Sequence, residues 1–154
     1  MGVTIHYAGK LCDLGRLPRM VEIARQHSKA NGWDFEIVPP RQSGPSGFVI
    51  RPHPDCEPLE IEFGKGNRFS NWVKTQFAGP EIHIQIIRFL REIKPVLGRL
   101  GVRDEGEFWK TESEETLESH MNQVNEIISR YRAENPSIQV KVKEPGGRIM
   151  DLIS

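Results

Sequence analysis

The chain has 154 residues, enough for one domain with a single core, and its 37% hydrophobic and 27% charged residues are typical of a globular protein. Its 21 basic and 21 acidic residues give a formal net charge of zero, which does not indicate a whole-protein field that attracts nucleic acid or an anionic membrane and leaves only a local charged patch for such binding. No apolar run reaches membrane-spanning length, and Cys12 and Cys56 form no CxxC pair, so we expect a cytoplasmic protein with reduced thiols.

The first half of the chain reads mainly as strands. Alternation of apolar and polar residues predicts strands over 3–8, 33–37, 48–51, 59–63 and 69–77. A helix is predicted between the first two, opening at Leu17-Pro18 and ending near Asn31-Gly32. The run from Pro39 to Gly47 reads as a surface loop, and short connections between the later strands favour antiparallel neighbours.

A central helix is predicted from Glu81, with Pro80 at its first position, where its missing N–H has no intrahelical partner anyway. One apolar stripe at helical spacing comprises Ile82, Ile86, Phe89, Leu90, Ile93, Leu97 and Leu100. Because Pro95 lacks a donor and clashes with the preceding turn, we expect a kink or break near Lys94. A short second helical piece would then end at Gly98 or Gly101.

The remaining sequence predicts a short acidic, partly extended stretch over 102–109, then another helix and a late edge strand. Thr111 and Ser113 both offer helix N-caps, and Asn135-Pro136 is the stop signal. Alternation over 138–143 predicts the edge strand. We therefore expect one domain over 1–143 and a tail over 144–154 that is disordered or docks on a neighbour.

The order β-α-β-β-β-β-α predicts an α+β domain with helices packed on one face of an antiparallel sheet. This order resembles the repeat unit of TATA-box-binding-protein-like folds, which implies a curved sheet, although order of elements does not transfer function. The motifs IHYAGKL, RPHPDCEPL, WVKTQFAGPEIHI and RDEGEFW resemble those of small uncharacterised bacterial proteins and cover residues 3–109. That resemblance implies no activity.

Strand alternation places Trp72, Lys74 and Gln76 on a sheet face directed away from the core. The same rule adds Thr4, His6, Asp34, Glu36, Glu60 and Glu62, with Arg51 and His53 nearby. We expect a binding surface in which Trp72 supplies contact area and the polar side chains orient a ligand. The alternative is an ordinary solvated sheet face. Nucleic acid is not expected as a partner, because the four acidic residues would repel phosphates.

His83 is the leading candidate among the histidines, since it lies one turn into the central helix, where a helix N-terminus can hold an anion. The alternative is a packed side chain on the flank of an amphipathic helix. His53 and Cys56 have ligand-like spacing, but no further ligands follow in a metal-binding pattern. We expect neither a metal nor a cofactor.

These observations favour a binding module that takes a small anionic ligand or a protein partner at the open sheet face and the start of the central helix. One alternative is a hydrolase-type enzyme that uses His83 with His6 or with a carboxylate from 104–107 as acid and base. Another is a subunit of a homo-oligomer, such as a homodimer, whose partner covers Trp72 and the late strand. No membrane association is expected.

Overall fold

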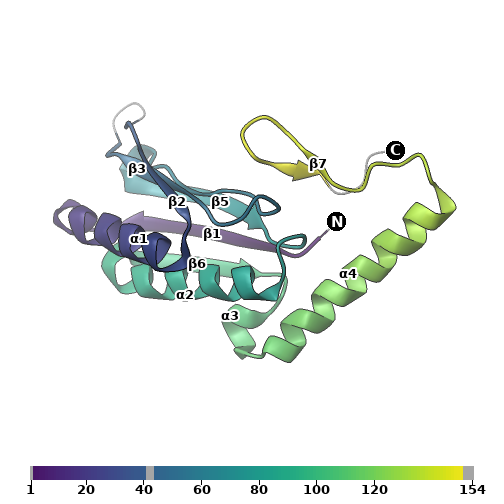
Figure 1. Ribbon diagram of the computed structural model, residues 1–154. Helices are drawn as coiled ribbons and strands as arrows, with labels where there is room; N and C mark the ends of the chain where they lie inside the picture. Colours follow the sequence, from purple (N-terminus) through teal and green to yellow (C-terminus); the bar gives the residue numbers. More distant parts are fainter. Residues whose placement is uncertain (1, 41–43, 151–154) are drawn as a thin grey trace.

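The protein is α+β, built from helices and antiparallel strands (Figure 1). The computed structural model describes residues 2–40 and 44–150; residues 41–43 of the predicted loop lie outside this part. The α-helices are α1 (Leu17–Asn31), α2 (Pro80–Leu97), α3 (Phe108–Thr111) and α4 (Glu114–Glu134). The strands are β1 (Thr4–Leu11), β2 (Asp34–Val38), β3 (Gly47–Arg51), β4 (Leu59–Ile61), β5 (Arg68–Lys74), β6 (Gly98–Asp104), β7 (Val142–Lys143) and β8 (Ile149–Met150).

The strands form two three-stranded antiparallel sheets, in the orders β5-β1-β6 and β2-β3-β4, and a small β7-β8 hairpin. The predicted order of elements is confirmed from β1 through α2. Two strands end earlier or start later than predicted: β5 stops at Lys74, and the late edge strand is reduced to β7. The strand β6 was not predicted and takes one edge of the β1 sheet.

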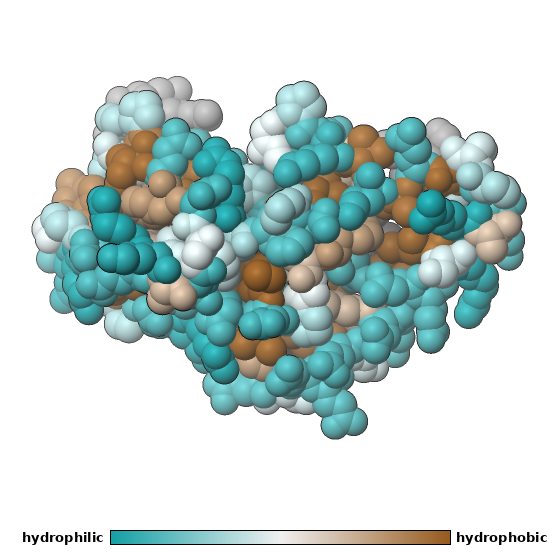
Figure 2. Space-filling view, viewed as in Figure 1, coloured by the Kyte–Doolittle hydropathy of each residue, from teal (hydrophilic) through white to brown (hydrophobic). Residues whose placement is uncertain are grey.

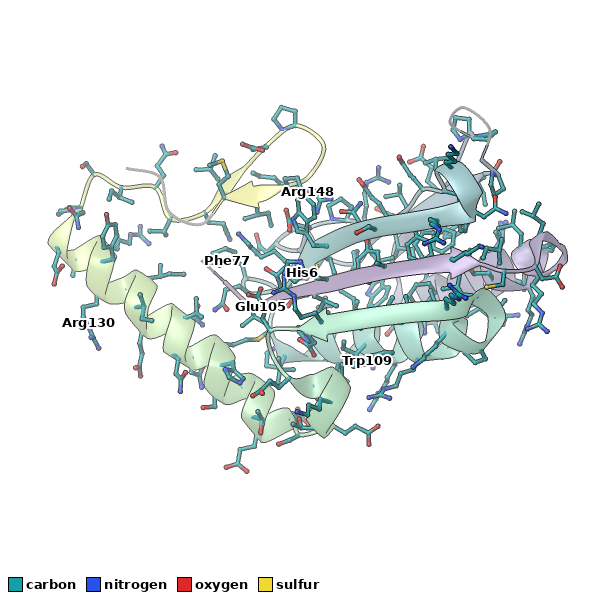
Figure 3. The ribbon with its side chains drawn as sticks, turned by 180° about the vertical axis from the view of Figure 1, so that it is seen from behind. His6, Phe77, Glu105, Trp109, Arg130 and Arg148 are labelled. Atoms are coloured by element: carbon teal, nitrogen blue, oxygen red, sulfur yellow. The ribbon has the colours of Figure 1, made fainter. Side chains whose placement is uncertain are left out.

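The helices α1 and α2 cover one face of the sheets, and the core lies between the two layers (Figure 1). The side of α2 that faces the strands is buried along its whole length, from His83 to Leu97. Ile84, which falls off the predicted stripe, is also buried, so it contacts another element. The opposite face of β5-β1-β6 carries no helix, as the view from behind shows (Figure 3).

The predicted break near Lys94 does not occur, because α2 runs through Pro95 to Leu97. Pro95 lies in the last turn, so its missing N–H costs one hydrogen bond at a terminus rather than one in the helix interior. Gly98 then takes a φ of 90°, in which its backbone N–H still bonds the Lys94 carbonyl, and the chain turns directly into β6. The predicted second helical piece is therefore absent, whereas Gly98, one of its two predicted end points, is where α2 stops.

Tyr7 stands where the two sheets meet. Its hydroxyl donates to the Glu60 carbonyl at 2.8 Å and accepts from the Glu60 N–H at 3.0 Å. Asn71 of β5 adds a bond from its side-chain amide to the Glu60 carboxylate at 3.3 Å. Side chains thus satisfy the edge of β4 where a backbone ladder to β5 is missing, and the predicted continuous sheet is divided at this point.

The C-terminal third packs against one end of this framework. Ser113 caps α4, its hydroxyl accepting from the Thr116 N–H at 3.1 Å. Gln76 holds α4 to the sheet, because it donates to the Met121 carbonyl at 3.0 Å and accepts from the Val3 N–H at 3.1 Å. Residues 144–150 complete the β7-β8 hairpin, and 151–154 of the predicted tail lie outside the described residues.

Hydrophilic side chains cover most of the helix-bearing face, and hydrophobic ones gather where α2, α3 and α4 meet and between α4 and the hairpin (Figure 2). In the described parts of the chain, no helix combines the length and the apolar character that a membrane crossing requires.

Candidate functional site

The helix-free face of β5-β1-β6, here called the open face, carries every second side chain of three adjacent strands. Across the strands, the pairing register groups these side chains into rows. From one end of the sheet to the other, the rows are Arg68–Lys10–Arg99, Ser70–Ala8–Gly101, Trp72–His6–Arg103 and Lys74–Thr4. Successive rows are about 6.6 Å apart, given the rise of a strand.

The first row brings three cations together, since Lys10 pairs directly with Arg68 on one side and with Arg99 on the other. Arg68 and Arg99 are exposed, and Lys10 is half-buried. Cross-strand neighbours of this kind have Cβ atoms about 5 Å apart, where like charges destabilise the sheet. No described carboxylate forms an ion pair with any of the three, so their repulsion is not relieved within the described chain.

The middle of the open face is low and shallow. Ser70, Ala8 and Gly101 form its second row and leave little side-chain bulk above the backbone. Three adjoining hollows follow the strands there, of about 530, 420 and 690 Å³. Neighbouring hollows share lining residues: Ala8 and Ser70 line the first two, and His6 and Trp72 line the last two.

The third row combines an aromatic ring, an imidazole and a guanidinium. Trp72 is 47% exposed, an unusual value for a tryptophan on a sheet. His6 lies between it and Arg103, and its Nε2 is 3.7 Å from a Glu105 carboxylate oxygen. Figure 3 shows His6 and Glu105 side by side at the end of the open face that the hairpin approaches.

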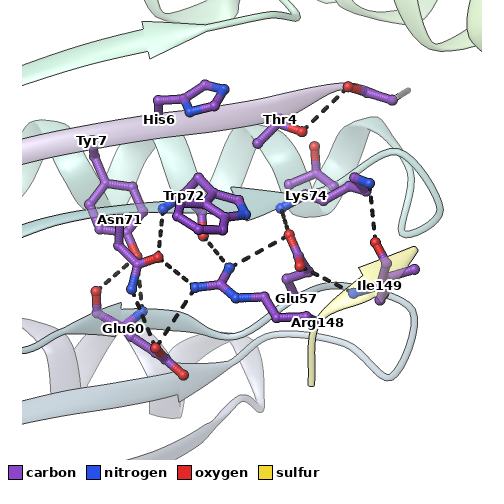
Figure 4. Close-up of polar contacts among 12 residues, drawn as sticks. Thr4, His6, Tyr7, Glu57, Glu60, Asn71, Trp72, Lys74, Arg148 and Ile149 are labelled. Atoms are coloured by element: carbon purple, nitrogen blue, oxygen red, sulfur yellow. Dashed lines mark hydrogen bonds and ion pairs between the residues drawn. The ribbon is translucent and has the colours of Figure 1, made fainter. Parts of the chain in front are cut away.

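Arg148, from the hairpin, fixes the Trp72 ring (Figure 4). Its guanidinium carbon lies 4.4 Å from the ring centroid, and it donates to the Trp72 carbonyl at 2.7 Å and to Asn71 Oδ1 at 2.5 Å. The buried Glu57 carboxylate completes the support, because it accepts from the backbone N–H groups of Lys74 at 2.8 Å and Ile149 at 3.1 Å. The ring is therefore held in place before any ligand arrives.

Three of the six predicted site residues lie on the open face: Trp72, Lys74 and His6 all line its largest hollow. The amine of Lys74 is engaged there, donating to the Ile149 carbonyl at 3.1 Å. Gln76 is not on this face. It follows the end of β5, is 3% exposed and bonds to α4, so the predicted alternation stops two residues before it.

His53 lies apart from the open face, in a hollow of about 580 Å³ between the ends of β2 and β3 and the hairpin. Its Nδ1 accepts from the Asp55 N–H at 2.9 Å, which stabilises a turn. Cys56 lines the same hollow but is buried, and burial raises the pKa of its thiol, so it is a poor nucleophile. Among the described residues, no group of three His, Cys, Asp or Glu side chains could hold a metal.

His83 is fully buried rather than placed at a surface junction. Its Nδ1 lies 2.7 Å from the Thr75 hydroxyl, and its Nε2 lies 2.9 Å from Asp104 Oδ1. This last contact is short, but the ring nitrogen and the carboxylate oxygen are not aligned as a hydrogen bond requires. Asp104 also accepts from the Gly106 and Trp109 N–H groups at 2.8 and 2.9 Å.

Burial opposes ionisation of Asp104, but the contact with His83 and the two backbone N–H groups outweigh it and hold the pKa of this carboxyl below its usual value. The Thr75–His83–Asp104 arrangement has the residue types of an acid–base relay. With both Thr75 and His83 0% exposed, however, no ligand can reach it in this conformation. It ties β5, α2 and the end of β6 together.

The predicted acidic residues mostly lie on the other sheet. Asp34 and Glu36 belong to β2 and Glu60 to β4, where Glu36 pairs with Arg51 at 3.1 Å. Sequence reasoning missed the main cations of the open face, because it assigned Arg99 to the end of a helix and Arg103 to the acidic, partly extended stretch over 102–109. Their alternation with Leu100 and Val102 in GRLGVRD was the signal that could have placed them on a strand.

Comparison of the chain with protein-family models, with curated proteins and with solved structures finds no match.

Proposed function

We propose that the protein is a binding module that takes an anionic ligand on the open face. The observation that carries this proposal is the row Arg68–Lys10–Arg99, three adjacent cations without a carboxylate partner in the described chain. Directly opposed like charges cost a sheet stability, so folding does not account for the row. An anion bound above it would remove the repulsion.

The chemistry of the row suits a phosphate or carboxylate group. Arginine presents two N–H donors in a planar fork that matches such groups, and lysine adds a point charge. Two arginines flanking a lysine can therefore bind one anion from both sides. The low row next to it, Ser70–Ala8–Gly101, leaves room for the rest of a ligand to lie along the strands toward Trp72.

The alternative of a hydrolase that uses His83 is less well supported. His83 and Asp104 do meet, at 2.9 Å, but their side chains are only 0% and 2% exposed. The proposed ligand site lies on the opposite side of the sheet from α2, where the one accessible histidine of the open face is His6. Binding explains the exposed groups without requiring the buried ones to act.

A thermal-shift experiment with inorganic pyrophosphate tests this function. A ligand at a hundredfold over its dissociation constant stabilises the fold by about 2.7 kcal/mol, which raises the melting temperature measurably. We expect this rise in the parent and in Arg88→Gln, a matched control on the exposed side of α2. We expect it to disappear in Arg68→Gln and in Arg99→Gln.

Sulfate at equal ionic strength serves as the second control, because excluded anions stabilise all folded proteins to some degree. An equal rise with pyrophosphate in all four proteins would show such a general effect and would contradict a site on the open face. No rise in any protein would contradict it as well.

A further inference from the structure

The open face is organised for an extended anion rather than for a single small one. Its three hollows share lining residues and so form one continuous trough along β1, from Lys65 and Arg68 at one end to Lys74 and Arg148 at the other. From Lys10 to Thr4 the trough is about 20 Å long, at the rise of a strand. A lone phosphate would fill a small part of it.

The positive charges are spread along this trough. Arg68, Lys10 and Arg99 stand at one end, whereas Arg103 stands two rows further on, about 13 Å away. Arg103 is exposed, and no described carboxylate forms an ion pair with it. Cations about 13 Å apart along a shallow path match the repeated negative charges of an extended polyanion.

An aromatic platform lies in the row that contains Arg103. Trp72 is nearly half exposed, and Arg148 holds its ring from the hairpin side. An accessible indole that is already held in place can stack a planar base, while the neighbouring cations contact the phosphates. His6, beside Trp72, offers a second ring in the same row.

We propose that the open face binds single-stranded nucleic acid, with phosphates over Arg68–Lys10–Arg99 and Arg103 and a base stacked on Trp72. This inference rests on the proposed function and specifies its ligand. The expectation against nucleic acid depended on acidic side chains sharing the face with Trp72. Three carboxylates line the hollow nearest the hairpin, those of Glu57, Glu105 and Glu144. Glu57 is buried and accepts from the backbone N–H groups of Lys74 and Ile149, and Glu105 lies 3.7 Å from His6. The described lining residues of the other two hollows, over the cation row and the middle of the face, include no acidic side chain.

Fluorescence anisotropy with a labelled 12-nucleotide oligothymidine tests the proposal on the full chain. We expect the oligonucleotide to bind at 50 mM salt. A plot of the logarithm of the association constant against the logarithm of the salt concentration should have a slope of about −2 to −3, as three to four phosphate contacts require. Arg99→Gln should weaken binding at least severalfold and make this slope shallower by about 0.7. Arg88→Gln, on the helix layer, should change neither value.

Stacking is tested separately, with two substitutions at one position. Trp72→Ala should weaken binding about tenfold, within the range known for loss of one base–aromatic stack, whereas Trp72→Phe should retain most of it. Because Trp72→Ala also removes the contact with Arg148, circular dichroism melting must show both variants folded at the assay temperature. If both variants bind as the parent does, stacking on Trp72 is wrong.

Binding of other ligands distinguishes the nucleic-acid inference from the proposed anion site. Pyrophosphate binding that Arg99→Gln abolishes, without oligonucleotide binding, would overturn the nucleic-acid inference and leave the anion site standing. If the parent bound neither pyrophosphate nor the oligonucleotide, the anion site and the nucleic-acid inference would both be overturned. A 12-base-pair duplex or a polyglutamate peptide that binds more tightly than the single strand would also overturn the nucleic-acid inference, in favour of duplex DNA or an acidic protein segment.

Discussion

Tyr7 and Glu60 are joined by a pair of hydrogen bonds in which one hydroxyl serves both backbone groups of the facing residue, at 2.8 and 3.0 Å. Strand β4 thus reaches the β1 sheet through a side chain rather than through a ladder with β5. Burial raises the pKa of the Tyr7 phenol, so the hydroxyl keeps its proton and its donor role at neutral pH. The contact lies where the sheet divides.

Tyr7→Phe removes that bridge and leaves the Glu60 N–H and carbonyl without partners. We expect the free energy of unfolding to fall by about 1–3 kcal/mol, the cost of leaving buried polar groups unsatisfied. Urea denaturation measures it. Tyr131→Phe is the matched control, because Tyr131 is 38% exposed on α4, and its loss of a hydroxyl should be nearly neutral. Equal stability of Tyr7→Phe and the parent would contradict the bridge.

Asp104 makes stability depend on pH at the acid end. Its pKa lies below the usual 3.8 in the folded state, so its contribution is fully present above pH 4 and is lost as the pH falls through the folded-state pKa. Asp104→Asn should cost about 1–3 kcal/mol near pH 7, since it replaces the carboxylate that accepts from the Gly106 and Trp109 N–H groups and lies 2.9 Å from His83. The difference in free energy of unfolding between the parent and this variant, measured by urea denaturation, should narrow from pH 5 to pH 2. A difference that stays constant would contradict the lowered pKa of Asp104.

The row Arg68–Lys10–Arg99 should lower the stability of the fold, although it supports anion binding. Neutralising its central member in Lys10→Gln removes two like-charge neighbours, and we expect stability to rise by about 0.2–1 kcal/mol at low salt. The gain should shrink as salt screens the repulsion. Denaturation of Lys10→Gln at 20 and 500 mM salt measures this. A loss of stability would show that the row has a structural partner and would remove the main support for an anion site.

The hairpin depends on the buried carboxylate of Glu57, which accepts from two backbone N–H groups and lies 3.7 Å from Arg148 (Figure 4). Glu57→Gln keeps the shape but replaces one acceptor oxygen by a donor. Hydrogen exchange should then show residues 142–150 losing protection before the β1 sheet does. Glu118→Gln, exposed on α4, should leave exchange unchanged. Unchanged protection in Glu57→Gln would contradict this role.

The sequence predicted the α+β class and the core order of elements because local patterns are strong there: alternation in β1, and Pro80 with an apolar stripe in α2. It failed at β6, where Leu97 and Leu100 suit a helix as well as the start of a strand, and only pairing with β1 decides. A local sequence pattern does not contain the stability that β6 gains by pairing with the distant strand β1.

The candidate site was predicted in part for a similar reason. Trp72, Lys74 and His6 follow from alternation alone, and the structure brings all three to one hollow. The same alternation also predicts Gln76, but β5 has already ended at Lys74. The cation row could not be predicted, because it requires the register that sets Arg68 and Arg99, 31 positions apart, on either side of Lys10.

The most direct test of an anion site on the open face is a chemical-shift titration of the ¹⁵N-labelled protein with inorganic pyrophosphate. We predict that the perturbed amides cluster at 8–10, 68–72 and 99–103, whereas those of α1 and the outer side of α2 stay in place. Perturbations centred on the helix layer, or none at millimolar pyrophosphate, would contradict the assignment of this face as the binding site.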